Sequence, residues 1–113
     1  MPPSRSNKLL WDATHAIDLA TGFIQTRDFE DYLTDVLLRS AVERQLLIVG
    51  EALAQLAQSD PETAFRVPEI RRIIGFRNVL VHGYGVVDDR TVWDLFQRRL
   101  PELREALQRL QNE

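Results

Sequence analysis

Apolar residues recur at steps of three and four along almost the whole chain, and stretches that alternate apolar and polar residues are nearly absent. This spacing predicts helices rather than strands. We expect a first helix over about residues 7–25 and a second over about residues 28–58, followed by a loop or a short helical turn over residues 60–67. A third helix should run from about residue 68 to residue 83, and a last one should fill the C-terminal quarter. Short connections between such helices indicate an all-α, antiparallel bundle of four to five helices.

Glycines, prolines and aspartates indicate where the later helices begin and end. Pro68 suits the first position of the third helix, and Gly83 should follow its last residue. Asp88 or Asp89 can cap the last helix, whereas Pro101 should kink or interrupt it.

The second predicted helix has two features that call for a neighbour. Thirty residues of helix would be about 45 Å long, which requires other helices along both ends or a partner chain. Gly50, in its interior, lowers helix propensity by about 1 kcal/mol relative to alanine. We therefore expect another helix to approach closely at Gly50, and we expect the protein to be a homodimer.

Composition narrows the class of protein. The 113 residues suit one domain, residues 1–113, and carry a net charge of −3. The absence of cysteine excludes disulfides, and two histidines make a histidine-rich metal site within one chain improbable. No cofactor is expected. No apolar run approaches the roughly 20 residues of a membrane span, and no signal segment is recognisable, so we expect a cytoplasmic protein.

One polar cluster interrupts the apolar third helix near its end. Arg77, Asn78, His82 and Tyr84 fall within eight residues. A histidine can give or take a proton near neutral pH, and an arginine stays charged and forks onto phosphate oxygens. A base that takes the ribose 2′-hydroxyl proton and a cation that stabilises the phosphorane-like charge are what metal-free cleavage of RNA requires. The cluster therefore suits a phosphodiester-cleaving site, whereas His82 taken alone also fits a structural histidine at the end of a helix.

The segment from Arg77 to Tyr84 resembles the R-x4-H-x-Y motif of HEPN-domain ribonucleases, in the form seen in HepT-like toxins. Further segments are similar to that family in the same order. They are Ile48-Val49-Gly50-Glu51-Ala52, Gly75-Phe76-Arg77-Asn78, Val87-Asp88, Val92-Trp93 and Leu100-Pro101-Glu102-Leu103. The resemblance covers nearly the whole chain.

This resemblance implies a dimeric HEPN-type bundle in which the motifs of two subunits approach each other. It implies a metal-independent RNA endonuclease that acts as the toxin of a toxin–antitoxin pair, with Arg77 and His82 catalytic and Asn78 supporting them. The implied partner is a minimal nucleotidyltransferase antitoxin that transfers AMP onto Tyr84. The added charge and bulk would then keep RNA out of the cleft.

Other polar residues have two interpretations each. Glu51 has apolar neighbours and needs a partner if buried, so it either orients Arg77 or His82 or forms a merely structural ion pair with Arg77. Arg71 and Arg72 are either RNA contacts or a solvated face. His15 is expected on a helix surface or at an interface. The tryptophans and phenylalanines are expected in the core or at a dimer interface rather than as a base-stacking platform.

Two further classes of function remain open at this stage. The chain could be a non-catalytic helical HEPN module that binds and partners a nucleotidyltransferase, or a structural dimerisation domain. The intact pair of Arg77 and His82 favours the enzyme over the binding module, and the polar cluster argues against a purely structural domain.

Overall fold

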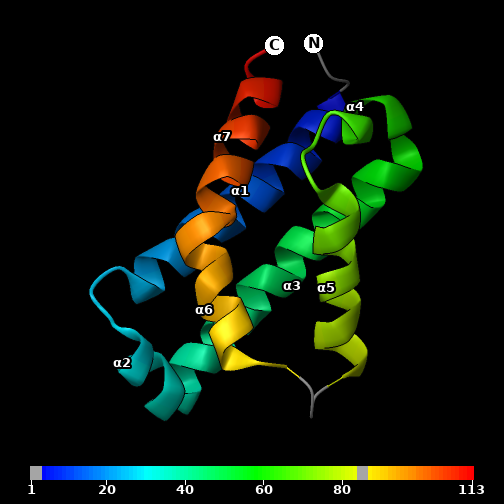
Figure 1. Cartoon of the computed structure of the whole chain (residues 1–113). Coiled ribbons are helices and arrows are strands. Elements are labelled where there is room, and N and C mark those ends of the chain that lie inside the picture. The colour runs from blue at the N-terminus through cyan, green and yellow to red at the C-terminus, as the bar shows by residue number, and fades with distance from the viewer. Residues whose placement is uncertain (1–3, 84–86) are drawn as a thin grey trace.

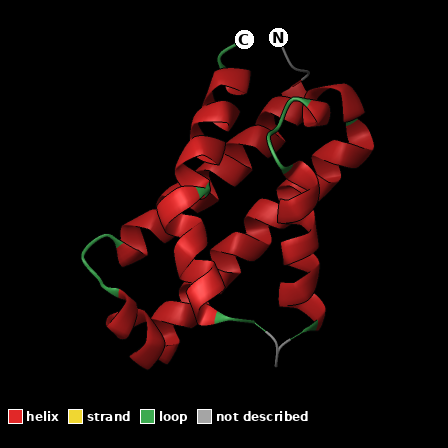
Figure 2. Ribbon diagram, in the orientation of Figure 1, coloured by secondary structure: helices red, strands yellow, loops and turns green. Residues whose placement is uncertain are grey.

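A computed structural model describes residues 4–83 and 87–113, and these residues form helices joined by short connections (Figures 1 and 2). The helices are α1 (Ser4–Ile24), α2 (Phe29–Thr34), α3 (Val36–Ser59), α4 (Pro61–Phe65), α5 (Ile70–His82), α6 (Asp89–Arg98) and α7 (Leu100–Gln111). The prediction of an all-helical chain is confirmed for the described residues.

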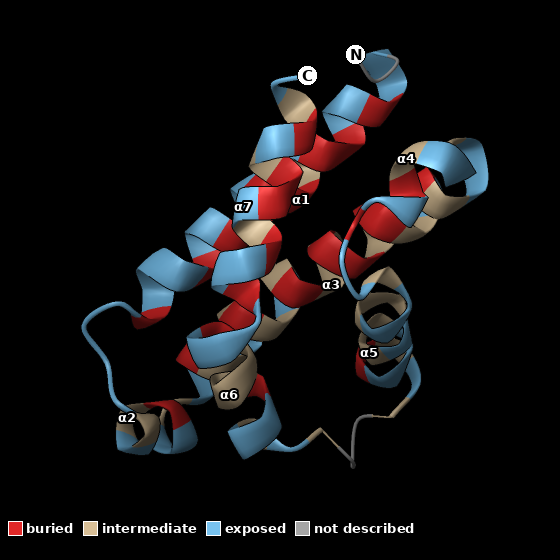
Figure 3. Cartoon of the chain, turned by 45° about the horizontal axis from the view of Figure 1, so that its top comes forward, coloured by how far each residue is buried: buried red, intermediate tan, exposed pale blue. Residues whose placement is uncertain are grey.

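Helices α1 and α3 are the longest and pack against each other in antiparallel directions (Figure 1). Helix α7 packs along α1, whereas α5 packs on the other flank of α3. The buried faces of α1, α3 and α7 point toward one another (Figure 3). The largest fully buried side chains come from these helices and from α2 and α6: Leu10, Ile17, Tyr32, Val42, Val49, Leu53, Leu56, Val92 and Leu107.

The single helix predicted over residues 28–58 is wrong, because the chain breaks at Asp35. This residue is extended, with φ −111° and ψ 98°, and its side chain accepts a hydrogen bond from the backbone N–H of Leu38 at 3.0 Å. Asp35 therefore ends α2 and caps α3, an arrangement that aspartate favours over a place inside a helix. Val36 and Leu37, which continue the apolar pattern across the break, are exposed.

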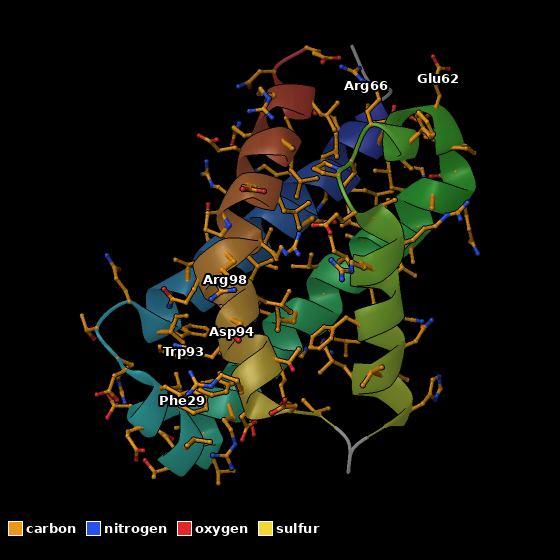
Figure 4. All side chains as sticks on the ribbon, in the orientation of Figure 1. Phe29, Glu62, Arg66, Trp93, Asp94 and Arg98 are labelled. Carbon is orange, nitrogen blue, oxygen red and sulfur yellow. The ribbon has the colours of Figure 1, made fainter. Side chains whose placement is uncertain are left out.

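Helix α2 is held to α6 by aromatic side chains. Phe29 and Trp93 lie with ring centroids 6.0 Å apart (Figure 4), and Tyr32 lies 5.8 Å from Trp93. The guanidinium of Arg90 lies 3.8 Å from the centre of the Phe29 ring. Trp93 thus packs inside the chain, as expected. Trp11 and Phe65 do not, because they are 49% and 89% exposed.

The third predicted helix begins later than expected. Pro68 lies before α5, and Glu69 forms the N-cap position in the left-handed region, with φ 57°. Its carboxylate accepts hydrogen bonds from Arg72 and Arg99, each at 2.8 Å. These bonds tie the start of α5 to the junction between α6 and α7.

The ends predicted for the later helices agree with the structure, whereas α1 begins at Ser4 rather than near residue 7. Helix α5 ends at His82 with Gly83 at its C-cap, and the side chain of Asp88 accepts from the N–H of Arg90 to cap α6. The last predicted helix is interrupted at Arg99, so that Pro101 lies in the first turn of α7. The break at Asp35, the short α4 and this interruption raise the four to five expected helices to the seven of the described residues.

Candidate active site

The site is built where α5 crosses α3 at Gly50. A Cβ atom placed on Gly50 would lie 2.2 Å from Cβ and 2.7 Å from Cγ of Arg77. Real carbon atoms do not approach so closely, so the crossing requires glycine at this position. The close approach predicted from the sequence is confirmed, and the residue that approaches Gly50 is Arg77.

The crossing places the guanidinium of Arg77 beside Glu51, the next residue of α3. Arg77 donates from Nε to Oε1 of Glu51 at 2.9 Å, and a terminal nitrogen of Arg77 also contacts that oxygen. The other terminal nitrogen donates to Oδ1 of Asn78 at 2.7 Å. These bonds use three of the five N–H groups of the guanidinium, which fixes its plane and leaves two N–H groups that an anion can meet.

The Arg77 side chain is partly accessible to solvent. It is 26% exposed, and the carboxylate side chain that holds it, Glu51, is 42% exposed. An ion pair at this depth contributes little to stability, about 0–1 kcal/mol. Its main physical effect is to restrict the orientation of the guanidinium.

His82 is the last residue of α5, and it is exposed. Five residues of ideal helix separate it from Arg77, which corresponds to about 7.5 Å along the axis and about 140° around it. Among the hydrogen bonds of residues 4–83 and 87–113, none joins His82 to Arg77. The structure thus brings Arg77, Asn78 and Glu51 together and places His82 at the same end of the same helix. Tyr84 lies outside the described residues.

The two arginines predicted as RNA contacts, Arg71 and Arg72, lie in different surroundings. Arg72 donates to Glu69 and lines a cavity of about 420 Å³ between α5 and the α6–α7 junction. That cavity has an apolar floor, which includes Ile73 and Phe76 of α5. Arg71 is exposed and lies on the same side of α5 as Asn78 and His82.

A groove that the sequence prediction missed runs between α1 and α3 and includes Glu51 of the site in its lining. Its volume is about 600 Å³, and it is lined by Trp11, His15, Leu19, Ile48 and Glu51 among others. The rings of Trp11 and His15 are stacked, with centroids 4.7 Å apart. His15 is exposed, as expected for a surface or interface position. The signal for this groove was the four-residue spacing of Trp11, His15 and Leu19 on one helix face.

Two classes of feature are not found in the described part of the chain. No group of three or more histidine, aspartate or glutamate side chains there is arranged to hold a metal ion. No helix there combines the length and the apolar character needed to cross a bilayer.

Comparison with known proteins gives a consistent match. Residues 13–110 match the family described as Ribonuclease HepT-like. The chain is 36% identical over 110 residues to a protein of Thermococcus cleftensis named "Probable ribonuclease HepT", covering 94% of this chain and 96% of that one. A "Putative RNase" of Caldanaerobacter subterraneus is 34% identical over 82 residues, covering 73% of this chain and 72% of the relative. A "Putative RNase" of Methanocaldococcus jannaschii is 26% identical over 110 residues, covering 97% and 94%. No solved structure matches the chain.

Proposed function

The chain belongs to the HepT-like ribonuclease family, and from this premise we propose that it is a metal-independent RNA endonuclease with Arg77 and His82 as its catalytic pair. The observation that carries the proposal is the geometry of Arg77. A guanidinium held on one side by Glu51 and on the other by Asn78 is a preorganised positive charge at the end of a helix whose last residue is an exposed histidine. Preorganised charge is the form of stabilisation that contributes most to catalysis of this kind.

The proposed reaction is an internal transesterification. His82 takes the proton of the ribose 2′-hydroxyl, and the 2′-oxygen attacks the adjacent phosphorus. The bond from phosphorus to the 5′-oxygen breaks, and that oxygen takes a proton from water and leaves as a 5′-hydroxyl. The protonated His82 then returns its proton to solvent. The other product ends in a 2′,3′-cyclic phosphate. Arg77 meets the phosphate with the two N–H groups that Glu51 and Asn78 leave available, and it stabilises the charge that develops there.

The proposed active form is a homodimer. Within one chain, Arg77 and His82 occupy different sides of α5, and a second copy would supply the opposite member of the pair across a shared cleft. The groove between α1 and α3 is the surface proposed for this contact. It carries the exposed Trp11 and Leu19, 49% and 39% accessible, and its lining includes Glu51. Large aromatic residues in such positions are typical of protein interfaces.

The proposed biological role is that of a toxin controlled by a minimal nucleotidyltransferase antitoxin. In this proposal the antitoxin joins the AMP group of ATP to the hydroxyl of Tyr84 and releases pyrophosphate. Tyr84 follows His82 by two residues, so the adenylate would add a negative charge and bulk beside the proton-transferring group. RNA would be excluded by repulsion and by obstruction.

Replacing Glu51 by glutamine tests the positioning of Arg77. We expect Glu51→Gln to lower kcat for RNA cleavage by about 10-fold or more, because small misplacements of a catalytic group are costly. The midpoint of thermal unfolding should change little, because an exposed ion pair contributes about 0–1 kcal/mol. Steady-state cleavage of a fluorescent RNA and a melting curve measure the two effects. Equal activity in parent and variant would show that Glu51 has only a structural role.

Expression in a bacterial host without the partner tests the toxin role. The parent should arrest growth, His82→Ala should not, and co-expression of a minimal nucleotidyltransferase from the same genome should restore growth. Mass spectrometry of the arrested culture should find Tyr84 unmodified. Normal growth with unmodified parent protein would contradict the toxin role and favour the non-catalytic binding module.

A further inference from the structure

One face of α5 carries a row of exposed, polar or small residues, which we call the α5 ridge: Arg71, Gly75, Asn78 and His82. Their spacing of four, three and four residues places them within about 60° of arc on a regular helix. From Arg71 to His82 the ridge is about 16 Å long. It carries no acidic and no large apolar side chain, although the chain as a whole has a net charge of −3.

Gly75, in the middle of the ridge, is not explained by packing within the chain. A Cβ atom on Gly75 would meet no atom within 4 Å, in contrast to Gly50, where it would collide with Arg77. Glycine inside a helix is unfavourable relative to alanine because it has more backbone freedom to lose on folding. A glycine that the fold does not need, on an exposed helix face, fits a position that another molecule approaches closely.

The polar side chains on and beside the ridge indicate which kind of molecule this is. Arg72, just off the ridge, is engaged by Glu69. No ion pair of Arg71 is found within the described ranges 4–83 and 87–113, and its side chain is exposed at the end of the ridge remote from His82. Asn78 accepts from Arg77 through its oxygen, so its amide N–H groups remain available as donors. A cation and amide donors in a row beside a glycine suit a strand of phosphates.

A second copy of the chain fits the ridge less well. Two facing ridges would bring Arg71 and His82 of each copy together without apolar contact between them. The exposed aromatic and aliphatic side chains suited to such a contact, Trp11 and Leu19, lie instead on α1.

We propose that the α5 ridge binds the sugar–phosphate backbone of single-stranded RNA for a few nucleotides to one side of the cleaved bond. Gly75 lets the strand lie directly against the helix, and Arg71 holds a phosphate about 16 Å from His82. This inference rests on the proposed ribonuclease function and names the part of the substrate that the site recognises. It makes Arg71 and Gly75 binding residues and leaves the chemistry to Arg77 and His82.

The test compares Gly75→Leu with Gly22→Leu. Gly22 is also exposed and helical, and a Cβ atom on it would also meet nothing within 4 Å, so it is a matched control. Binding of a fluorescent, 2′-O-methylated RNA dodecamer, which the enzyme cannot cleave, is measured by anisotropy with protein whose Tyr84 is unmodified. We expect Gly75→Leu to weaken binding by about 10-fold or more and Gly22→Leu to leave it unchanged. Gly75→Ala serves as the milder variant should the leucine variant fold poorly.

A second pair of variants separates charge from shape. Arg71→Ala should weaken binding and reduce the slope of log affinity against log salt by about 1, as expected for the loss of one phosphate contact. Arg72→Ala should leave that slope unchanged.

The outcomes separate a failure of the proposed RNA-binding ridge from a failure of the proposed ribonuclease function. If the parent cleaves unmodified RNA but Gly75→Leu and Gly75→Ala bind the dodecamer as the parent does, the ridge is overturned and the function stands. If the parent cleaves no RNA, the function is overturned and the ridge with it. If Gly75→Leu alone lowers the molecular mass measured by light scattering, Gly75 belongs to a contact between copies and the RNA-binding ridge is overturned.

Discussion

Replacing His82 by alanine is expected to lower the rate of RNA cleavage by about 10²- to 10⁴-fold, the usual contribution of a general acid–base group. His82 is exposed at the end of α5, so the free energy of unfolding should change by no more than about 0.5 kcal/mol. Single-turnover cleavage of a labelled RNA and denaturation in urea measure the two quantities. The loss of activity would then be assigned to chemistry rather than to unfolding.

The chain supplies a matched control for this substitution. His15 is the other of its two histidines and is stacked on Trp11 along α1. His15 also lines the groove proposed for the dimer contact, so His15→Ala should keep the cleavage chemistry as long as light scattering shows that the dimer persists. The double variant Arg77→Ala/His82→Ala should be only slightly less active than the less active of the two single variants. The effects of substituting groups that act as a unit are not additive. Cleavage by His82→Ala at the parental rate would show that the catalytic assignment is wrong.

Replacing Gly50 by alanine should have the largest effect of any change outside the catalytic pair. The added Cβ would lie 2.2 Å from Cβ of Arg77, so α5 must move away from α3. Overpacking of this kind costs about 1–3 kcal/mol of stability. The movement also carries Arg77 away from its position, and a displacement of about 1 Å can cost about 10²-fold in rate. Urea denaturation and cleavage kinetics should both register the change.

Gly22→Ala should change the stability of the protein in the opposite direction from Gly50→Ala. A Cβ atom on Gly22 would meet nothing within 4 Å, so the alanine should stabilise the protein by about 0.4–1 kcal/mol through reduced freedom of the unfolded chain. Activity should stay at the parental value. Equal stability changes for Gly50→Ala and Gly22→Ala would contradict the packing described at the crossing of α3 and α5.

The sequence predicted the parts of the site that depend on local chemistry. Gly50 inside a long helix indicates a close approach, and the apolar neighbours of Glu51 indicate that its carboxylate needs a partner such as Arg77. Both contacts are present. The sequence could not predict that Gly50 and Arg77 meet each other, because that pairing depends on where α5 crosses α3.

The errors in the predicted helices also have physical causes. Asp35 lies within an apolar pattern that continues through Val36 and Leu37, so periodicity alone does not reveal that its side chain caps α3. Glu69 takes a left-handed conformation that is uncommon for residues other than glycine, and sequence rules place Pro68 at the helix start instead. In both places a side-chain contact outweighs the general pattern.

The most direct test of the central claim is incubation of the purified protein, with Tyr84 shown by mass spectrometry to be unmodified, with RNA in EDTA. The account predicts cleavage without added metal, with products that end in a 2′,3′-cyclic phosphate and a 5′-hydroxyl. Cleavage that appears only when a divalent cation is restored, or products that carry 5′-phosphates, would contradict the mechanism assigned to Arg77 and His82.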